Sequence, residues 1–225
     1  MKKYFITASG SEIGKTLVTS ALAWQLRKLE KKVKALKPVV SGFDAVQVAA
    51  TDTGKLLRAQ ALPFSEDNIS AVSPWRFTAP VSPDQAAEEE GAHIDFDEVV
   101  AFCRQQESGD YLLVEGIGGV MTPLDESHTV IDWMVALGYP VILVAGNYLG
   151  SLSHTLSACH AVLSRGLTLH TVLINEARVS PTTPQRTRAT LRRFLPRDTT
   201  VQVITRLDHS PELWKHVPDL TPLIV

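Results

Sequence analysis

Short apolar runs rich in β-branched residues alternate along the chain with longer segments in which apolar positions recur every three to four residues. The short runs have the length and composition of buried strands, and the longer segments have the period of helices that cover a sheet. This alternation predicts an α/β fold, a single doubly wound and mainly parallel sheet with helices on both faces. The predicted strands are residues 4–8, 33–37, 111–115, 141–145, 171–174 and 200–204. The predicted helices are residues 15–30, 45–62, 96–106, 130–137, 152–164 and 184–194.

One stretch departs from this alternation. Residues 63–92 contain four prolines and a run of three glutamates near their end. We expect a long excursion at one edge of the sheet with one short helix at residues 83–90. A linker between two domains is the alternative, but the alternation resumes afterwards without a change in composition. The chain is therefore interpreted as one domain over residues 1–225.

Composition and charge limit the kinds of function. The 225 residues are 44% hydrophobic, which suits a globular core. The 22 basic and 24 acidic residues give a net charge of -2 and are spread along the chain, so we expect no nucleic acid or membrane partner. No apolar run approaches the roughly 20 residues of a membrane helix, and the start lacks the apolar core of a secretory signal. Cys103 and Cys159 lie in apolar helical patterns, as expected of buried thiols in a reducing, cytoplasmic compartment.

A phosphate-binding loop lies directly after the first predicted strand. Residues 9–16 read Ser-Gly-Ser-Glu-Ile-Gly-Lys-Thr and open the first helix. In such a loop Gly14 lets the backbone approach phosphates, Lys15 reaches the β and γ oxygens, and Thr16 places its hydroxyl on magnesium. The generic pattern has glycine at Ser9, so a plain strand-to-helix turn is the alternative. A lysine at a helix N-terminus is unfavourable unless an anion offsets it, which favours a fold of the P-loop NTPase type.

Two more charged side chains follow predicted strands. Glu115 ends an apolar run before a glycine-rich turn, and Lys37 follows the run at residues 33–36. Ligands collect at the carboxyl ends of strands in such sheets, so both side chains should face the phosphate loop. The alternatives are a surface carboxylate and a solvated lysine, and the convergence of three motifs on one edge disfavours them. Asp52 is either a helix cap or a magnesium contact, and the residues alone leave that open.

Taken together, these segments resemble the dethiobiotin synthetase family over nearly the whole chain. The resemblance implies an ATP-dependent cyclo-ligase of biotin biosynthesis. In that family one amine of 7,8-diaminopelargonate takes up CO2 as a carbamate, which becomes a carbamic-phosphoric anhydride and closes the ureido ring, giving dethiobiotin, ADP and phosphate. The matching segments are residues 7–16, Lys-Pro-Val-Val-Ser-Gly at 37–42, Asp52, Val-Glu-Gly-Ile-Gly-Gly at 114–119, Gly-Ser-Leu-Ser-His at 150–154, and Asn175. The departures from the family pattern are Ala8, Gly10, Ser153, Glu176, Gln202 and Thr205.

The resemblance also implies the site residues, with ATP and Mg²⁺ as cofactors. The catalytic lysines would be Lys37 and Lys15, and the magnesium ligands Thr16, Asp52 and Glu115. The nucleotide-binding residues would be Glu12, Ile13, Gly14, Lys15, Thr16, Leu17, Asp52, Glu115, Gly116, Ile117, Gly118, Asn175, Glu176, Thr205, Arg206, Leu207 and Glu212. The residues for the diamine would be Ser11, Glu12, Lys37, Ser41, Gly150, Ser151, Leu152 and Ser153. The last four would come from the partner subunit of a homodimer, or would simply begin a helix.

Three other functions remain open. The first is a nucleotide-dependent switch of the partitioning-ATPase kind. Such switches have a lysine early in the phosphate loop, whereas this chain has Ser9, Gly10 and Ser11 there. We also expect no basic surface helix after the loop. A ligase that acts on a larger carboxylate, such as a corrin, generally carries a glutaminase domain, which we do not expect in a chain of this length. A catalytically degenerate paralogue would bind nucleotide without turnover.

Overall fold

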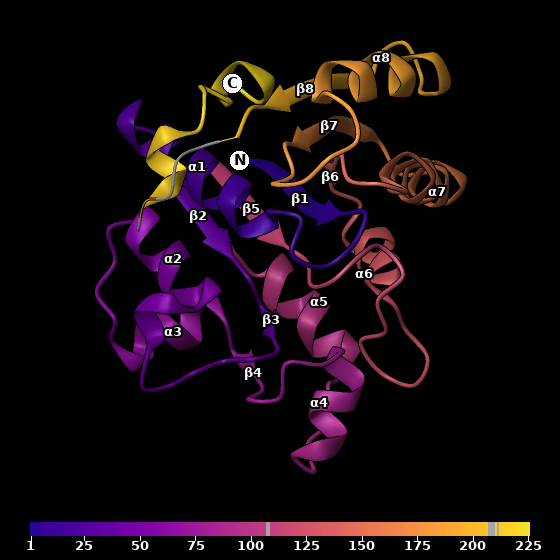
Figure 1. Ribbon diagram of the computed structural model, residues 1–225. Coiled ribbons are helices and arrows are strands. Elements are labelled where there is room, and N and C mark those ends of the chain that lie inside the picture. The colour runs from indigo at the N-terminus through magenta and orange to yellow at the C-terminus, as the bar shows by residue number, and fades with distance from the viewer. Residues whose placement is uncertain (107–108, 207–209, 211) are drawn as a thin grey trace.

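The computed structural model describes residues 1–106, 109–206, 210 and 212–225. A six-stranded sheet in the order β2-β5-β1-β6-β7-β8 forms its centre, and every neighbouring pair is parallel (Figure 1). The six predicted strands are confirmed. Their bounds are β1 (Lys2–Ala8), β2 (Val33–Leu36), β5 (Tyr111–Glu115), β6 (Val141–Gly146), β7 (Leu169–Asn175) and β8 (Thr200–Ile204).

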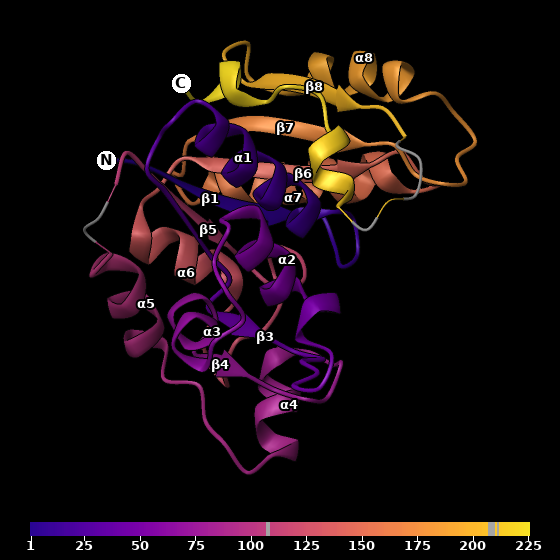
Figure 2. The same ribbon diagram turned by 90° about the vertical axis from the view of Figure 1, so that its left-hand side faces the viewer.

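Helices cover both faces of the sheet (Figure 2). Because successive side chains of a strand point to opposite faces, Phe5 belongs to one buried cluster while Tyr4 and Ile6 belong to the other. This confirms the doubly wound α/β class. One face carries α1 (Lys15–Lys28), α2 (Asp52–Ala59) and α3 (Glu66–Val72). The opposite face carries α5 (Phe96–Arg104), α6 (Val130–Leu137), α7 (Ser151–Ser164) and α8 (Pro184–Phe194).

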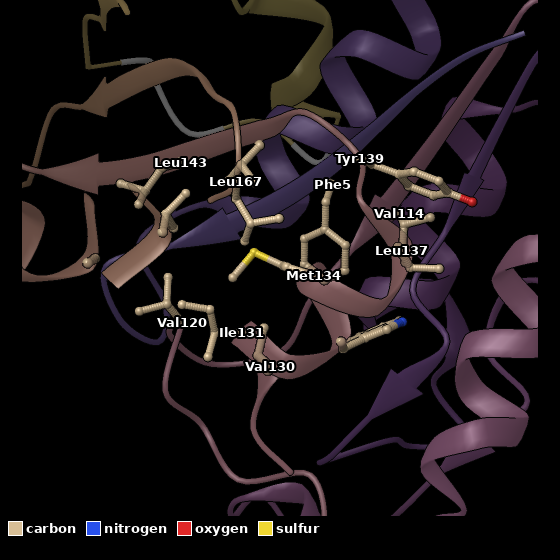
Figure 3. Packing of buried hydrophobic residues seen from close by; sticks show 14 of the residues in the cluster. Phe5, Val114, Val120, Val130, Ile131, Met134, Leu137, Tyr139, Leu143 and Leu167 are labelled. Carbon is tan, nitrogen blue, oxygen red and sulfur yellow. The ribbon is translucent and has the colours of Figure 1, made fainter. Parts of the chain in front are cut away.

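The core beneath α6 fixes β1, which leads into the phosphate loop, and β5, which ends at Glu115. Phe5 of β1 meets Trp133 of α6 edge to face, with ring centroids 5.0 Å apart. Figure 3 shows Met134 and Leu137 of the same helix gathered around Phe5, with Val114 of β5 nearby. Burying each side chain of this size contributes about 1.5–3 kcal/mol. The carboxyl ends of β1 and β5 are therefore held by close packing rather than by the loops that follow them.

The predicted helix at residues 45–62 is wrong over its first half. That stretch begins as a loop, continues as a 3₁₀ turn η1 (Val48–Ala50), and becomes helical only at α2. The side chain of Thr51 accepts the backbone N–H of Gly54 and caps α2. Asp52 is thus the first helical residue rather than the cap, so its carboxylate is available for another contact.

The excursion after α2 holds more structure than the single helix predicted. Its predicted helix is present as α4 (Pro83–Glu89), but α3 and a short strand β4 (Trp75–Arg76) precede it. β4 pairs in parallel with β3 (Val39–Val40), which follows β2 directly, and so forms a second small sheet. The excursion packs at the β2 edge, where the Lys37 N–H donates to the Val72 carbonyl. The edge location is therefore confirmed.

Gly54 lets η1 pack directly against α2. A Cβ atom at this position would lie 1.9 Å from the Val48 carbonyl oxygen. Helix propensity alone would make Gly54→Ala stabilising by about 1 kcal/mol, but the overpacked contact costs about 1–3 kcal/mol. We expect a net loss of stability, measured by denaturant-induced unfolding. A gain in the free energy of unfolding would contradict the close contact.

Two expectations from composition can be compared with the structure. Cys103 and Cys159 are free and buried, as predicted. Burial raises the pKa of each thiol to about 12, so neither is a nucleophile at neutral pH. Over the ranges that the structure describes, every helix is too short or too polar to span a bilayer.

Candidate active site

The carboxyl ends of β2, β5 and β1, three neighbouring strands, meet at one edge of the sheet. The phosphate loop leaves β1 and enters α1, Lys37 follows β2, and Glu115 is the last residue of β5. Lys37 Nζ lies 3.0 Å from Glu115 Oε1, so residues 78 positions apart in the sequence are in contact. The structure thus brings the three motifs to one place.

The phosphate loop turns through two left-handed residues, Glu12 (φ 56°) and Gly14 (φ 108°). Gly14 leaves no space for a side chain, because a Cβ atom there would lie 2.5 Å from Asn175 Nδ2. Asn175 Nδ2 also donates to the Ile13 carbonyl at 2.9 Å, which ties the loop to the end of β7. The first turn of α1 has no acidic residue and no side-chain cap, so its N–H groups remain suited to an anion.

Lys15 is buried at the start of α1. Its Nζ donates to the Gly118 carbonyl at 2.6 Å and to the Gly10 carbonyl at 3.3 Å. Burial, together with the neighbouring charge of Lys37, lowers the pKa of Lys15 to about 8. Its direct partners are neutral carbonyl oxygens, so the ammonium charge is available to an incoming anion.

Lys37 joins two carboxylates in a buried ionic cluster. Its Nζ bonds Asp52 as well as Glu115, and Glu115 is 0% exposed. Thr16 Oγ1 donates to Glu115 Oε1 at 2.6 Å. Burial alone would lower the pKa of Lys37, but the charges of Glu115 and Asp52 raise it above its ordinary value. Although burial opposes it, Lys37 holds the pKa of Asp52 well below the usual range. Lys37 and Asp52 are therefore ionised at neutral pH.

Thr16, Asp52 and Glu115 together fit a divalent cation. Glu115 Oε2 is buried and has no hydrogen-bond partner among the described residues, which is costly for a carboxylate oxygen. A hydroxyl and two carboxylates are hard oxygen donors, which Mg²⁺ prefers. In the described ranges, no group of three or more His, Cys, Asp or Glu side chains converges, so the cation set would be these two carboxylates and one hydroxyl.

A cavity of about 870 Å³ opens beside the cluster. Its size lies within the range of pockets for small molecules and cofactors. Eleven of the residues implied by the resemblance line it: Ser11, Glu12, Gly14, Lys15, Thr16, Leu17, Lys37, Ser41, Asp52, Ile117 and Gly118. Glu115 lies behind this wall, in contact with Thr16 and Lys37.

The start of α7 does not line this cavity. Gly150 is the helix N-cap, with φ 92°, and beside it the Tyr148 hydroxyl pairs with His154 Nδ1 at 2.9 Å. Besides Glu115, the implied residues outside the lining are Ile13, Gly116, Gly150, Ser151, Leu152, Ser153, Asn175, Glu176, Thr205, Arg206 and Glu212. Leu207 lies outside the described residues. A single copy of the chain therefore brings the phosphate loop, Lys37 and Asp52 to one cavity, whereas residues 150–153 at the start of α7 lie outside it.

Some of the expected nucleotide residues instead contact one another. Glu176 Oε2 accepts the Arg206 N–H at 2.8 Å, and Glu212 pairs with Lys215. Asn147, which the sequence did not single out, joins the loops around them. Its side chain donates to the Thr182 carbonyl at 3.0 Å and accepts the N–H of Ala177 at 2.7 Å.

Several residues that line the cavity were not predicted. They are Lys55, Pro80, Val81, Ser82, Thr122, Pro123, Ser210, Leu213 and Trp214. Only Lys55 had a local signal, because it lies three residues after Asp52 on a helix, where side chains share a face. Trp214 belongs to η2 (Leu213–His216), which packs against α1 through long-range contacts.

The phosphate loop at the end of β1, with a buried lysine and carboxylates beside it, defines a P-loop nucleotide-binding protein. A family described as "AAA domain" matches residues 2–217. The chain belongs to the dethiobiotin synthetase family. It is 47% identical over 198 residues to the ATP-dependent dethiobiotin synthetase of Acidiphilium cryptum (strain JF-5), covering 87% of this chain and 89% of that protein. It is 41% identical over 192 residues to the enzyme of the same name from Methylobacterium nodulans, covering 82% and 85%.

Solved structures of other proteins share the fold. The MinC:MinD cell division complex of Aquifex aeolicus contains a chain with a TM-score of 0.58 and 14% identity, covering 96% of this chain and 86% of that one. A ParA family ATPase from Chlorobium tepidum has a TM-score of 0.55 and 14% identity, covering 92% and 85%. At this identity the likeness concerns the fold alone. The family resemblance predicted from the sequence, and with it an ATP-dependent ligase of biotin biosynthesis, is confirmed.

Proposed function

We propose that this protein converts 7,8-diaminopelargonate, CO2 and ATP to dethiobiotin, ADP and phosphate, and that residues 1–225 act as one ligase domain. Family membership supports the overall reaction. One observation supports its location: Lys15, Lys37, Asp52 and Glu115 are gathered at the edge of the sheet beside one cavity.

The reaction requires two anions to meet. One amine of the substrate takes up CO2 as a carbamate, and a carbamate oxygen then attacks the γ-phosphorus while ADP leaves. Attack of the second amine on the carbonyl carbon closes the ring and expels phosphate. Two unit charges 4 Å apart interact by about 4 kcal/mol at an effective dielectric constant of 20. Lys15 and Lys37 are the cations that offset this repulsion, and preorganised charge of this kind stabilises the transition state.

Magnesium would be held by Thr16, Asp52 and Glu115, whose oxygen donors suit it. When bound, the ion neutralises and orients phosphate oxygens. Ser41 is proposed for the diamine end, with Ser11 and Glu12, because its buried Oγ lines the cavity and has no partner among the described residues. The base of ATP is proposed to lie toward residues 175–176, 205–206 and 212. Of these, Asn175 ends β7 and contacts the phosphate loop through the Ile13 carbonyl.

We propose a homodimer that completes the substrate site through residues 150–153 of the partner subunit. Two large apolar side chains are exposed on the loops beside that helix start, Leu149 at 84% and Val179 at 85%. The contacts of Asn147 hold these two loops together. Exposed apolar side chains on neighbouring loops are typical of a protein interface, which supports the dimer. We also place the protein in the cytoplasm, in line with its buried free thiols.

Helix α8 is more basic than the overall charge suggests. It carries four exposed arginines, Arg186, Arg188, Arg192 and Arg193, and no acidic residue. The sequence-based expectation of no basic surface helix is therefore wrong. Because a basic helix is a general feature of polyanion-binding surfaces, nucleic acid belongs among the conditions of the functional test.

The function is tested by phosphate release with and without 7,8-diaminopelargonate, at fixed bicarbonate, ATP and Mg²⁺. We expect release to depend on the diamine and to match the dethiobiotin formed, measured by mass spectrometry. Duplex DNA should leave both unchanged. Equal release with and without the diamine would indicate a nucleotide-dependent switch. Absence of release under every condition would indicate a degenerate paralogue.

A further inference from the structure

Lys55 is a cationic residue of the cavity wall that neither the motifs nor the resemblance assigns. It lies on α2, one turn after Asp52, and lines the cavity beside the ionic cluster. Its Nζ donates to Asp52 Oδ1 at 3.2 Å. This bond directs the ammonium group toward the carboxylate that also contacts Lys37.

Lys55 differs from the other two lysines in what its ammonium group can still bind. Lys15 donates to two backbone carbonyls, and Lys37 contacts two carboxylates, and both are buried. The Lys55 side chain is 41% exposed. An ammonium group has three N–H donors, and within the described part of the chain only the one to Asp52 has a protein acceptor. Two donors are therefore left for a ligand or for solvent in the cavity that Lys55 lines.

The backbone beneath Lys55 is fixed in place. Thr51 caps the helix at Gly54, and Gly54 packs so closely on Val48 that a methyl group would not fit. Lys55 follows Gly54 directly, so its flexible stem starts from an anchored turn. A cation on an anchored turn loses less conformational entropy on binding an anion than one on a free loop.

We propose that Lys55 binds an anionic oxygen of the reacting groups, at the point where the γ-phosphoryl group and the carbamate meet. The inference rests on the proposed function, because that reaction brings both anions beside Asp52. Lys55 then provides a third positive charge in the cavity wall, on α2. The oxygen that Lys55 binds belongs either to the γ-phosphoryl group or to the carbamate. Nucleotide binding and the KM for the diamine distinguish these two cases.

The experiment compares Lys55→Met, which keeps the apolar stem, with Lys55→Arg, which keeps the charge. Lys31→Met, on an exposed turn after α1, is the matched control for the loss of one lysine. Calorimetry with Mg²⁺ measures binding of ADP and of a non-hydrolysable ATP analogue. Steady-state kinetics measures KM for the diamine and kcat, with circular dichroism to check folding.

If the ligand is the γ-phosphoryl group, Lys55→Met weakens binding of the ATP analogue roughly tenfold, about 1.4 kcal/mol, and changes ADP binding little. If it is the carbamate, nucleotide binding is unchanged and KM for the diamine rises roughly tenfold. In both cases Lys55→Arg recovers most of the loss. The proposal is overturned if Lys55→Met matches Lys31→Met in every measurement, or if arginine restores nothing. A wild-type protein that binds the analogue but forms no dethiobiotin would contradict the proposed function instead, while analogue binding still tests Lys55.

Discussion

Lys37→Met is expected to lower dethiobiotin formation by roughly a hundredfold to a thousandfold, the loss seen when one preorganised electrostatic group is removed. Methionine keeps the length of the stem but leaves Asp52 and Glu115 side by side without their shared cation. Breaking a buried pair in this way costs about 3–5 kcal/mol. The variant should therefore also unfold at lower temperature. Both effects are measured on the same preparation, by mass spectrometry of the product and by thermal unfolding.

The two effects of this substitution can be separated. Turnover is measured at a temperature where circular dichroism shows the variant to be folded, and Lys31→Met serves as the control. A purely structural role for Lys37 predicts that activity follows the folded fraction. Near-normal turnover of folded Lys37→Met protein would remove Lys37 from the chemistry.

Glu115→Gln is expected to weaken binding of Mg²⁺ and to lower turnover at least roughly a hundredfold, because a metal contributes several kcal/mol to transition-state stabilisation. The substitution keeps the shape of a side chain that is 0% exposed. It retains an oxygen that can accept the Thr16 hydroxyl, which now bonds Glu115 Oε1. What it removes is the negative charge and one of the two carboxylates. Binding of Mn²⁺ alone, followed by electron paramagnetic resonance, measures the metal site without turnover.

Glu89→Gln on α4 is the control for this experiment, since that carboxylate is exposed and does not line the cavity. We expect it to bind Mn²⁺ as the wild type does. If Glu115→Gln also retains wild-type Mn²⁺ affinity and Mg²⁺ dependence, Glu115 is not a metal ligand.

The strands and the phosphate loop were predictable because their signals are local. Each strand is a short apolar run, and the loop motif lies directly between a strand and a helix. The start of the helix within residues 45–62 was not predictable from periodicity. It is set by the Thr51 side chain, which accepts the Gly54 N–H and caps α2, and by the close packing of Gly54 on Val48. The extent of that helix depends on these specific contacts rather than on apolar spacing.

The site divides in the same way. Lys15, Lys37 and Glu115 follow from the rule that the carboxyl ends of parallel strands share one edge of the sheet. Ser82 reaches the cavity only through the packing of the excursion, and Trp214 only through the packing of the C-terminal segment on α1. The spacing of residues in the sequence does not indicate this packing. The structure places residues 150–153 at the start of α7, and their role in a partner's substrate site stays a prediction.

The long connection between β2 and β5 carries part of the cavity wall. Lys15 and Thr16 lie at the start of α1, just after β1 and the phosphate loop. By contrast, Asp52, Lys55 and Ser82 all lie in the long connection between the neighbouring strands β2 and β5. A change in this connection can therefore alter one wall of the cavity without altering β1 or the loop that follows it.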